Sequence, residues 1–197
     1  MWAEQSARFR DTLLATQRAE LDIAYGTGDR EKYDLFLPDN TPKGLVIFVH
    51  GGYWKAFDKS RWSHLANGAV AKGWAVCMPS YTLAPDTRLS QITGQIAAAI
   101  NHAAAHIDGP IHLTGHSAGG HLVSRMVSET SPLLSDTLSR VKNTVSISGL
   151  HDLRPLLNTS MNDVLGLDAQ EAVMESAALL RPALPCSITC WVGADER

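Results

Sequence analysis

The stretch that decides the fold is Ile111 to Val127, with the sequence IHLTGHSAGGHLVSRMV. It predicts a short apolar strand, a turn of small residues and an apolar helix that begins near Ala118. Gly115 and Gly119 lie two positions either side of Ser117, which matches the G-x-S-x-G nucleophile elbow. Small residues are needed there because the strand turns so sharply that larger side chains would collide with the backbone. Ser117 is therefore the predicted nucleophile, and a tight turn without chemistry is the alternative.

Continuous apolar runs recur on both sides of this stretch. Uninterrupted runs of this kind are typical of strands buried on both faces of a parallel sheet. Between them, Leu89 to Ile107 has apolar residues every three or four positions, which predicts a helix. The alternation predicts an α/β fold with an open, doubly wound, mostly parallel sheet and catalytic groups at the carboxyl ends of the strands. The predicted strands are Leu45–Val49, Trp74–Met78, Ile111–Thr114, Val145–Ile147 and Ile188–Val192.

The first forty residues have a different pattern. A helix is expected from about Glu4 to Glu20, followed by strands around Leu21–Tyr25 and Lys32–Leu37. In the second strand, Tyr33, Leu35 and Leu37 alternate with Asp34 and Phe36, so we expect a half-exposed antiparallel strand.

Composition excludes several classes of function. The 197 residues are 45% apolar and 19% charged, which fits one globular domain. The net charge is -3 and there is no basic stripe, so we expect no nucleic-acid partner and no membrane partner. The N-terminus is polar and resembles no signal peptide, and no apolar run approaches a membrane span. Cys77, Cys186 and Cys190 cannot all pair, which favours reduced core residues in a cytoplasmic protein.

A second glycine motif follows the strand that ends at Val49, with the sequence His50-Gly51-Gly52-Tyr53-Trp54. Paired glycines allow backbone N–H groups to point into a cavity, which a tetrahedral oxyanion requires. The predicted donors are the N–H groups of Gly52 and Tyr53, together with that of Ala118 after the nucleophile. A plain glycine turn is the alternative, which the elbow in the same chain makes less favourable.

These two motifs resemble the α/β-hydrolase fold, in its arylformamidase (kynurenine formamidase) and small carboxylesterase branch. That branch carries an HGGxW motif, in which Tyr53 fills the variable position. Ser80 to Pro85 resembles the Y-R-L-A-P element of related esterases, except that Thr82 stands where an arginine is usual. Ser148 to Pro155 resembles a loop of the same branch. The resemblance implies a serine hydrolase that cleaves a small acyl amide or ester, with N-formylkynurenine as the family's substrate.

A triad needs an acid, which in this fold follows the nucleophile in the chain. Asp195 is the predicted acid, because it comes after an apolar strand and two small residues. Asp152, after the preceding strand, is the rival, and its alternative role is to cap a short helix near Leu153 to Leu157. Glu196 is one residue further on and should point away from the site.

The general base is the part of the triad that the sequence does not supply. In this fold a histidine follows the acid, but all eight histidines precede Asp195. His151 follows a strand and is free to approach Ser117, so it is the alternative base. We expect that the sequence stops short of the last strand and of the histidine loop. Residues 1–197 would then form a single α/β-hydrolase domain without its C-terminal strand.

The remaining histidines have structural interpretations. His50 is expected to brace the glycine loop by hydrogen bonding, His116 to pack beneath the elbow and His121 to point down the helix. His102 and His106 have the i, i+4 spacing of a metal pair but lack an H-E-x-x-H glutamate. We therefore predict neither a metal nor a cofactor.

The predicted function is hydrolysis through an acyl-enzyme on Ser117, with a formyl group as the acyl group that the resemblance implies. The residues do not separate an aryl formamide from an ester or thioester, and a non-catalytic binding protein of the same fold is a further alternative. Partners are expected to be a small-molecule acyl substrate and, as an open option, a second copy in a homodimer. Four aromatic residues could stack on an aromatic substrate or simply pack beside the cleft: Tyr53, Trp54, Phe57 and Trp62.

Overall fold

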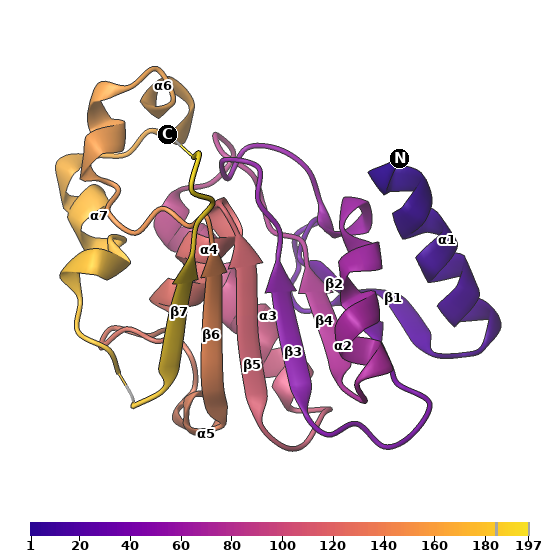
Figure 1. The fold of residues 1–197 in the computed structure, drawn as a ribbon. Coiled ribbons are helices and arrows are strands. Elements are labelled where there is room, and N and C mark those ends of the chain that lie inside the picture. Colours follow the sequence, from indigo (N-terminus) through magenta and orange to yellow (C-terminus); the bar gives the residue numbers. More distant parts are fainter. Residues whose placement is uncertain (184, 197) are drawn as a thin grey trace.

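A computed structural model describes residues 1–183 and 185–196 (Figure 1). Arg197, the last residue of the predicted domain, lies outside this described part. The strands are β1 (Ala19–Ala24), β2 (Lys32–Phe36), β3 (Leu45–Val49), β4 (Ala75–Pro79), β5 (Ile111–His116), β6 (Val141–Ile147) and β7 (Ser187–Trp191). They form one 7-stranded sheet in the order β1-β2-β4-β3-β5-β6-β7.

The sheet is mixed, and its parallel part holds the predicted site. Strands β4, β3, β5, β6 and β7 pair in parallel, whereas β1 and β2 are antiparallel additions at one side. The carboxyl ends of the parallel strands therefore meet at one edge, the upper edge in Figure 1. This arrangement confirms the predicted doubly wound, mostly parallel sheet.

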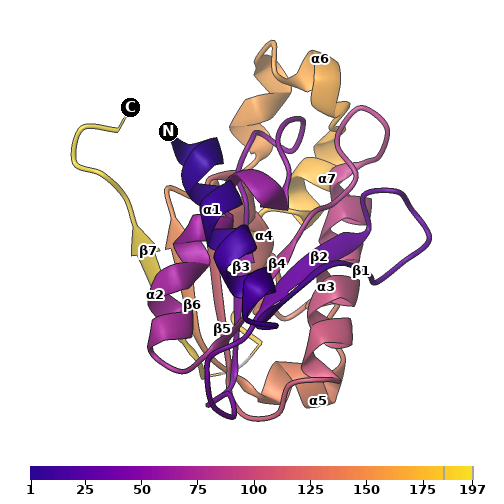
Figure 2. The same ribbon diagram turned by 90° about the vertical axis from the view of Figure 1, so that its right-hand side faces the viewer.

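Helices cover the sheet on both faces (Figure 2). One face carries α1 (Trp2–Ala15) and α2 (Asn67–Ala71). The other carries α3 (Leu89–Ala104), α4 (Ala118–Arg125) and α5 (Ser135–Ser139). Two short helices, α6 (Asn162–Leu165) and α7 (Ala169–Met174), lie in the segment that leads to β7. Single 3-10 turns cover Lys59–Arg61, Ser63–Ala66, Arg154–Asn158 and Ala177–Leu179.

Strand β3 shows why the sheet is stable at its centre. Leu45, Ile47 and Val49 pack into the larger core cluster, which includes the inner side chains of α3 and α4. Phe48, between them in the sequence, packs into the smaller cluster with Leu13 of α1. Because successive side chains of a strand point to opposite faces, a wholly apolar strand requires cover on both.

Two expectations about strand burial are wrong. Strand β2 is buried on both faces rather than half-exposed, because α1 covers Phe36 on one side and the larger cluster includes Tyr33 and Leu35 on the other. Strand β7 is exposed at all five positions, although its apolar run predicted burial. Within the described residues its one strand neighbour is β6, so it forms an edge of the sheet.

The cysteines and the helix lengths refine the sequence interpretation. All three cysteines are free. Cys77 is buried and Cys186 is half-buried against the larger core cluster, whereas Cys190 is exposed, so the prediction of core residues is wrong for Cys190. The N-terminal helix ends at Ala15, before the predicted end, because residues from Ala19 pair with β2.

None of the described helices has the length and apolar content that crossing a membrane requires.

Candidate active site

Ser117 lies at the turn between β5 and α4, with φ 53° and ψ -116°. A positive φ is rare for residues other than glycine and costs on the order of 1–3 kcal/mol, so the surrounding contacts must enforce it. One such contact is the Ser117 N–H, which donates to the carbonyl oxygen of Ile147 on β6 at 2.8 Å. The turn is thus held by a neighbouring strand. The Ser117 hydroxyl makes no hydrogen bond with the described residues.

The two elbow glycines are required by close backbone approach. A Cβ on Gly115 would lie 2.3 Å from the carbonyl oxygen of Gly119. A Cβ on Gly119 would lie 2.0 Å from the carbonyl oxygen of Val49, at the end of β3. Both distances are far below van der Waals contact, so the elbow packs directly against the strand that leads into the glycine loop.

The glycine loop after β3 reaches the nucleophile. A Cβ on Gly51 would lie 3.2 Å from Cβ of Ser117 and 2.8 Å from the carbonyl oxygen of His116. Gly52 has φ 127°, and a Cβ there would lie 2.3 Å from the carbonyl oxygen of Ala56. The two predicted motifs, separated by more than sixty residues in the sequence, therefore form one contiguous site.

The predicted oxyanion donors have no competing partners. Among the described residues, no acceptor receives a hydrogen bond from the N–H groups of Gly52, Tyr53 or Ala118. Ala118 is the first residue of α4, where a backbone N–H has no partner within the helix and favours negative charge. These are the properties that an oxyanion site requires.

His50 braces the loop, as the sequence predicted. Its Nδ1 lies 2.8 Å from the carbonyl oxygen of Gly51, and its ring stacks on Tyr81 with centroids 4.4 Å apart. The Tyr81 hydroxyl donates to the carbonyl oxygen of His50 at 3.2 Å. Burial lowers the pKa of His50 to about 4, so its imidazole is neutral near pH 7. It is a structural residue.

Two cations that the sequence interpretation missed connect this part of the chain to the β1–β2 hairpin: Arg30 lies in the turn between the two strands, and Lys59 follows the glycine loop. Arg30 donates to the carbonyl oxygens of Tyr81, at 2.8 Å, and of Phe57. Lys59 is buried and pairs with Asp34 at 2.9 Å and with Asp22 at 2.7 Å. Asp34 and Lys59 lie 25 positions apart in the sequence, so no local pattern could have indicated this ion pair.

The predicted acid lies in an exposed segment. Asp195 is exposed and forms no ion pair or side-chain hydrogen bond with the described residues. Its neighbour Glu196 instead accepts hydrogen bonds from the Ser148 hydroxyl at 2.7 Å and from the Gly193 N–H at 2.9 Å. The Ser148 hydrogen bond lowers the pKa of Glu196. Contrary to the expectation that it points away, Glu196 reaches back to the loop after β6.

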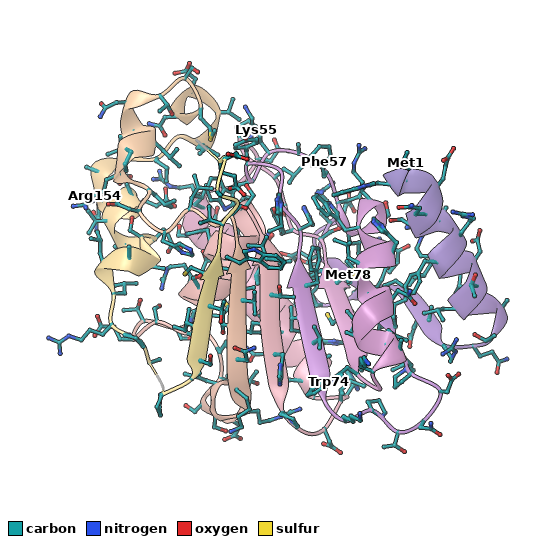
Figure 3. The ribbon with its side chains drawn as sticks, viewed as in Figure 1. Met1, Lys55, Phe57, Trp74, Met78 and Arg154 are labelled. Carbon is teal, nitrogen blue, oxygen red and sulfur yellow. The ribbon has the colours of Figure 1, made fainter. Side chains whose placement is uncertain are left out.

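The rival acid is committed elsewhere. Asp152 pairs with Arg154 at 2.7 Å and also accepts a hydrogen bond from its backbone N–H at 3.1 Å. The Arg154 guanidinium holds the pKa of Asp152 at about 2. In Figure 3, Arg154 lies at the outer flank of the molecule, whereas Phe57 and Lys55 lie over the edge where the parallel strands end.

His151, the alternative base, faces another direction. Its Nε2 lies 3.2 Å from the Ser146 hydroxyl and 3.8 Å from the Cys190 thiol. It also lines an apolar cavity between α4, the segment around Ala178 and β7. Burial lowers its pKa. No hydrogen bond joins it to Ser117 in the described part of the chain.

The other histidines are also accounted for by local contacts. The His116 side chain packs beside Trp62, with ring centroids 5.6 Å apart. His102 accepts or donates a hydrogen bond with the Tyr33 hydroxyl at 2.9 Å and packs beside His106. Residues 1–183 and 185–196 contain no group of three histidine, cysteine, aspartate or glutamate side chains that could hold a metal ion.

The four aromatic residues divide into two pairs. Trp54 is fully buried and Trp62 is 7% exposed, so both belong to the core. Tyr53 is 51% exposed and Phe57 is 46% exposed. The Phe57 ring lies against the glycine loop, because a Cβ on Gly52 would approach its Cδ2 to 2.9 Å. Only Tyr53 and Phe57 of this set are available to a substrate.

Comparison with known proteins agrees with this geometry. A family model described as BD-FAE matches residues 33–183. Kynurenine formamidase of Danio rerio is 33% identical over 187 residues, covering 89% of this chain and 63% of that protein. The same enzyme of Salmo salar is 35% identical over 173 residues, covering 85% of this chain and 58% of that protein. The chain thus spans about three-fifths of the length of these relatives.

A solved structure is more similar still. The crystal structure of a proposed thioesterase from Silicibacter sp. TM1040 is 55% identical, with a TM-score of 0.96, and the match covers 100% of this chain and 74% of that chain. The family match includes the elbow at Ser117 and the glycine loop at Gly51 and Gly52. The chain therefore belongs to the BD-FAE family of α/β hydrolases.

Proposed function

We propose that this protein is a serine hydrolase that cleaves a small acyl amide or ester through an acyl-enzyme on Ser117. The observation that carries the proposal is the approach of the glycine loop to the strained elbow, with Gly51 packed against Ser117. A turn without chemistry would need neither a positive φ at a serine nor three unpartnered N–H groups beside it. A non-catalytic binding protein would leave these two features unexplained, so the catalytic interpretation is preferred.

The chemistry follows from the parts. The Ser117 oxygen attacks the carbonyl carbon while a base takes its proton. The N–H groups of Gly52, Tyr53 and Ala118 hold the oxyanion, and each contributes about 3 kcal/mol to lowering the barrier. The base then protonates the leaving group, and water releases the acyl group.

The acid and the base complete the proposal. We assign Asp195 as the acid, because it follows β7 at the same edge of the sheet as Ser117. The base is proposed to come from outside these 197 residues. The support is that the two histidines nearest the elbow in the chain, His116 and His121, and the alternative base His151 all make other contacts.

The substrate proposal is an aryl formamide such as N-formylkynurenine. Its support is the likeness to two proteins named kynurenine formamidase and the exposure of Phe57 and Tyr53 beside the oxyanion donors. An aromatic leaving group could stack on either ring. Thioester hydrolysis is the second candidate, favoured by the likeness to the Silicibacter protein.

A covalent probe tests the nucleophile. A fluorophosphonate should label the active enzyme once, at Ser117. Mass spectrometry of the whole protein gives the number of labels, and peptide mapping gives their position. Ser117→Ala should abolish labelling and lower kcat by about 10⁶. Ser148→Ala is the matched control, because Ser148 also has a positive φ, 50°, at the end of the neighbouring strand. Labelling of Ser148, or full turnover by Ser117→Ala, would show that the assignment is wrong.

A substrate and length comparison tests the rest. The 197-residue chain is assayed beside a version extended by the downstream reading frame, with N-formylkynurenine, a p-nitrophenyl ester and an acyl thioester. Higher turnover of the formamide by the longer chain is expected. Full activity of the short chain would instead assign the base to a histidine among the 197 residues. A preference for the thioester would favour the second candidate.

The homodimer and the cytoplasmic location stay predictions. For the location, the support is the free state of Cys77, Cys186 and Cys190. Light scattering of the purified protein would measure its oligomeric state.

A further inference from the structure

His121 is a buried titratable side chain that the proposed mechanism does not use. It lies on α4, one turn after Ser117, and is fully buried. Its Nδ1 lies 3.3 Å from Nε1 of Trp54, and the two rings meet edge to face with centroids 5.3 Å apart. Its Nε2 lies 2.8 Å from the carbonyl oxygen of Glu175. His121 therefore connects the glycine loop to the segment that follows α7.

The two partners determine the protonation state of the ring. The indole N–H can only donate and the Glu175 carbonyl can only accept. Both hydrogen bonds form together only when His121 is neutral and carries its proton on Nε2. Burial lowers the pKa of His121 to about 3, and the Arg125 charge adds to this effect, so the neutral form is the one present near pH 7.

Trp54 passes this constraint to the oxyanion donors. Its side chain is fully buried, and its carbonyl oxygen accepts a hydrogen bond from the Ala84 N–H at 2.9 Å. Its φ is 56°, and that of Tyr53, directly before it, is 53°. Two consecutive residues with positive φ need strong restraint, because each costs on the order of 1–3 kcal/mol. The indole hydrogen bond to His121 supplies part of that restraint next to the Tyr53 N–H.

The other end of the connection is firmly held. The Glu175 carboxylate accepts hydrogen bonds from the Thr93 hydroxyl on α3 at 2.6 Å and from Nε of Arg125 on α4 at 3.2 Å. Glu175 is 4% exposed. The carbonyl that selects the His121 tautomer thus belongs to a residue fixed against two helices of the core.

We propose that His121 is a positioning residue for the oxyanion site, holding Trp54 so that the adjacent N–H groups face the carbonyl attacked by Ser117. This inference rests on the proposed function, because it needs the glycine loop to bind an oxyanion. It does not make His121 a base, since both ring nitrogens are engaged away from the nucleophile.

The test compares variants that keep or lose the two hydrogen bonds. His121→Leu leaves the Trp54 N–H and the Glu175 carbonyl without partners, so kcat of the intact protein should fall on the order of 10²-fold while KM changes little. His121→Gln should recover most of kcat, because its amide oxygen can accept from Trp54 and its amide nitrogen can donate to Glu175. A purely structural role would lower thermal stability in His121→Leu without changing kcat of the folded fraction.

Trp54→Phe keeps a buried ring and removes only the N–H, so it covers the case in which His121→Leu does not fold. Trp54→Phe should lower kcat. In the double variant Trp54→Phe/His121→Leu, the loss of activation free energy should be much smaller than the sum of the losses in the two single variants. Unchanged kcat in Trp54→Phe, or a Gln variant as impaired as the Leu variant, would overturn the inference. Ser117→Ala separates the two hypotheses. Full turnover by Ser117→Ala would contradict the proposed function itself. If Ser117→Ala is inactive but Trp54→Phe is unimpaired, only the role of His121 is contradicted.

Discussion

The loop after β3 and the segment after β7 end at the same edge of the sheet, yet they differ in how firmly they are held. In the first, His50, Gly52 and Trp54 are buried. The loop accepts hydrogen bonds from Arg30 and Tyr81, and its Trp54 indole N–H donates to His121. In the second, residues 192–196 are all exposed, and the described side-chain contacts are those of Glu196. The oxyanion half of the site is therefore preorganised, whereas the acid half depends on what packs against β7.

The position of each strand in the sheet explains the difference. Strand β3 lies between β4 and β5 and has helices on both faces, so the loop that leaves it starts from a rigid point. Strand β7 is an edge with one described neighbour. Preorganised donors need no reorganisation during the reaction, which is why a rigid glycine loop suits this role.

The largest effect that would sharpen this comparison concerns the acid. In the intact protein, Asp195→Asn should lower kcat on the order of 10⁴-fold if Asp195 orients the base. Asp152→Asn should cost far less, because Asp152 is paired with Arg154. Glu196→Gln, which removes the charge from the neighbouring carboxylate, is the matched control. Steady-state kinetics of the three variants gives the ranking, and a greater loss in Asp152→Asn or Glu196→Gln would move the acid to that residue.

The second prediction concerns the close backbone packing between the elbow and the end of β3. Gly119→Ala should destabilise the fold by at least about 4 kcal/mol, because the new Cβ would meet the Val49 carbonyl and neither backbone can move freely. Gly94→Ala is the matched control, since Gly94 is also in a helix, α3, and has nothing within 4 Å of its Cβ position. It should stabilise by roughly 0.5–1 kcal/mol. Equal urea midpoints for the two variants would contradict the close packing of elbow and loop.

A smaller effect comes from the buried His50. Its pKa is about 4 in the folded protein and about 6.5 when unfolded. Above pH 6.5 both states are neutral and stability is unaffected. Below it, the unfolded chain binds a proton that the folded chain excludes, so the free energy of unfolding falls by about 1.4 kcal/mol per pH unit until the folded pKa is reached.

Urea unfolding between pH 4.5 and 7 measures this slope. Burial also lowers the pKa of His121, His64, His112 and His151, so these residues add to the slope, and His50→Gln should remove only the part that His50 contributes. An unchanged slope in His50→Gln would mean that His50 is charged or solvated in the folded protein.

The smallest effect belongs to the exposed edge. Trp191 is 65% exposed at the end of β7, so Trp191→Ser in the 197-residue chain should change the free energy of unfolding by no more than about 0.5 kcal/mol. Phe36→Ala, at a fully buried aromatic residue, should cost about 3–5 kcal/mol. Denaturant titration of both variants checks the contrast, and a large loss in Trp191→Ser would show that β7 is covered in solution.

The sequence by itself was sufficient for the fold class and for the centre of the site. Uninterrupted apolar strands predicted the parallel sheet, and the spacing of Gly115, Ser117 and Gly119 predicted the elbow. Both signals are local, because a strand buried on two faces and a tight turn each restrict the residues that form them. The glycine loop was predicted for the same reason, and the structure places it against Ser117.

Only the tertiary structure decided which contacts hold that site and which side chains are free. Lys59 with Asp34, Arg30 with Phe57, and His121 with Trp54 join residues 25 to 67 positions apart. No periodicity or motif encodes such pairs. The exposure of β7 was likewise not evident from its apolar run, because such a run indicates a strand but not whether other elements cover it. Local patterns report what a segment can form, whereas pairing and burial depend on which distant segments meet it.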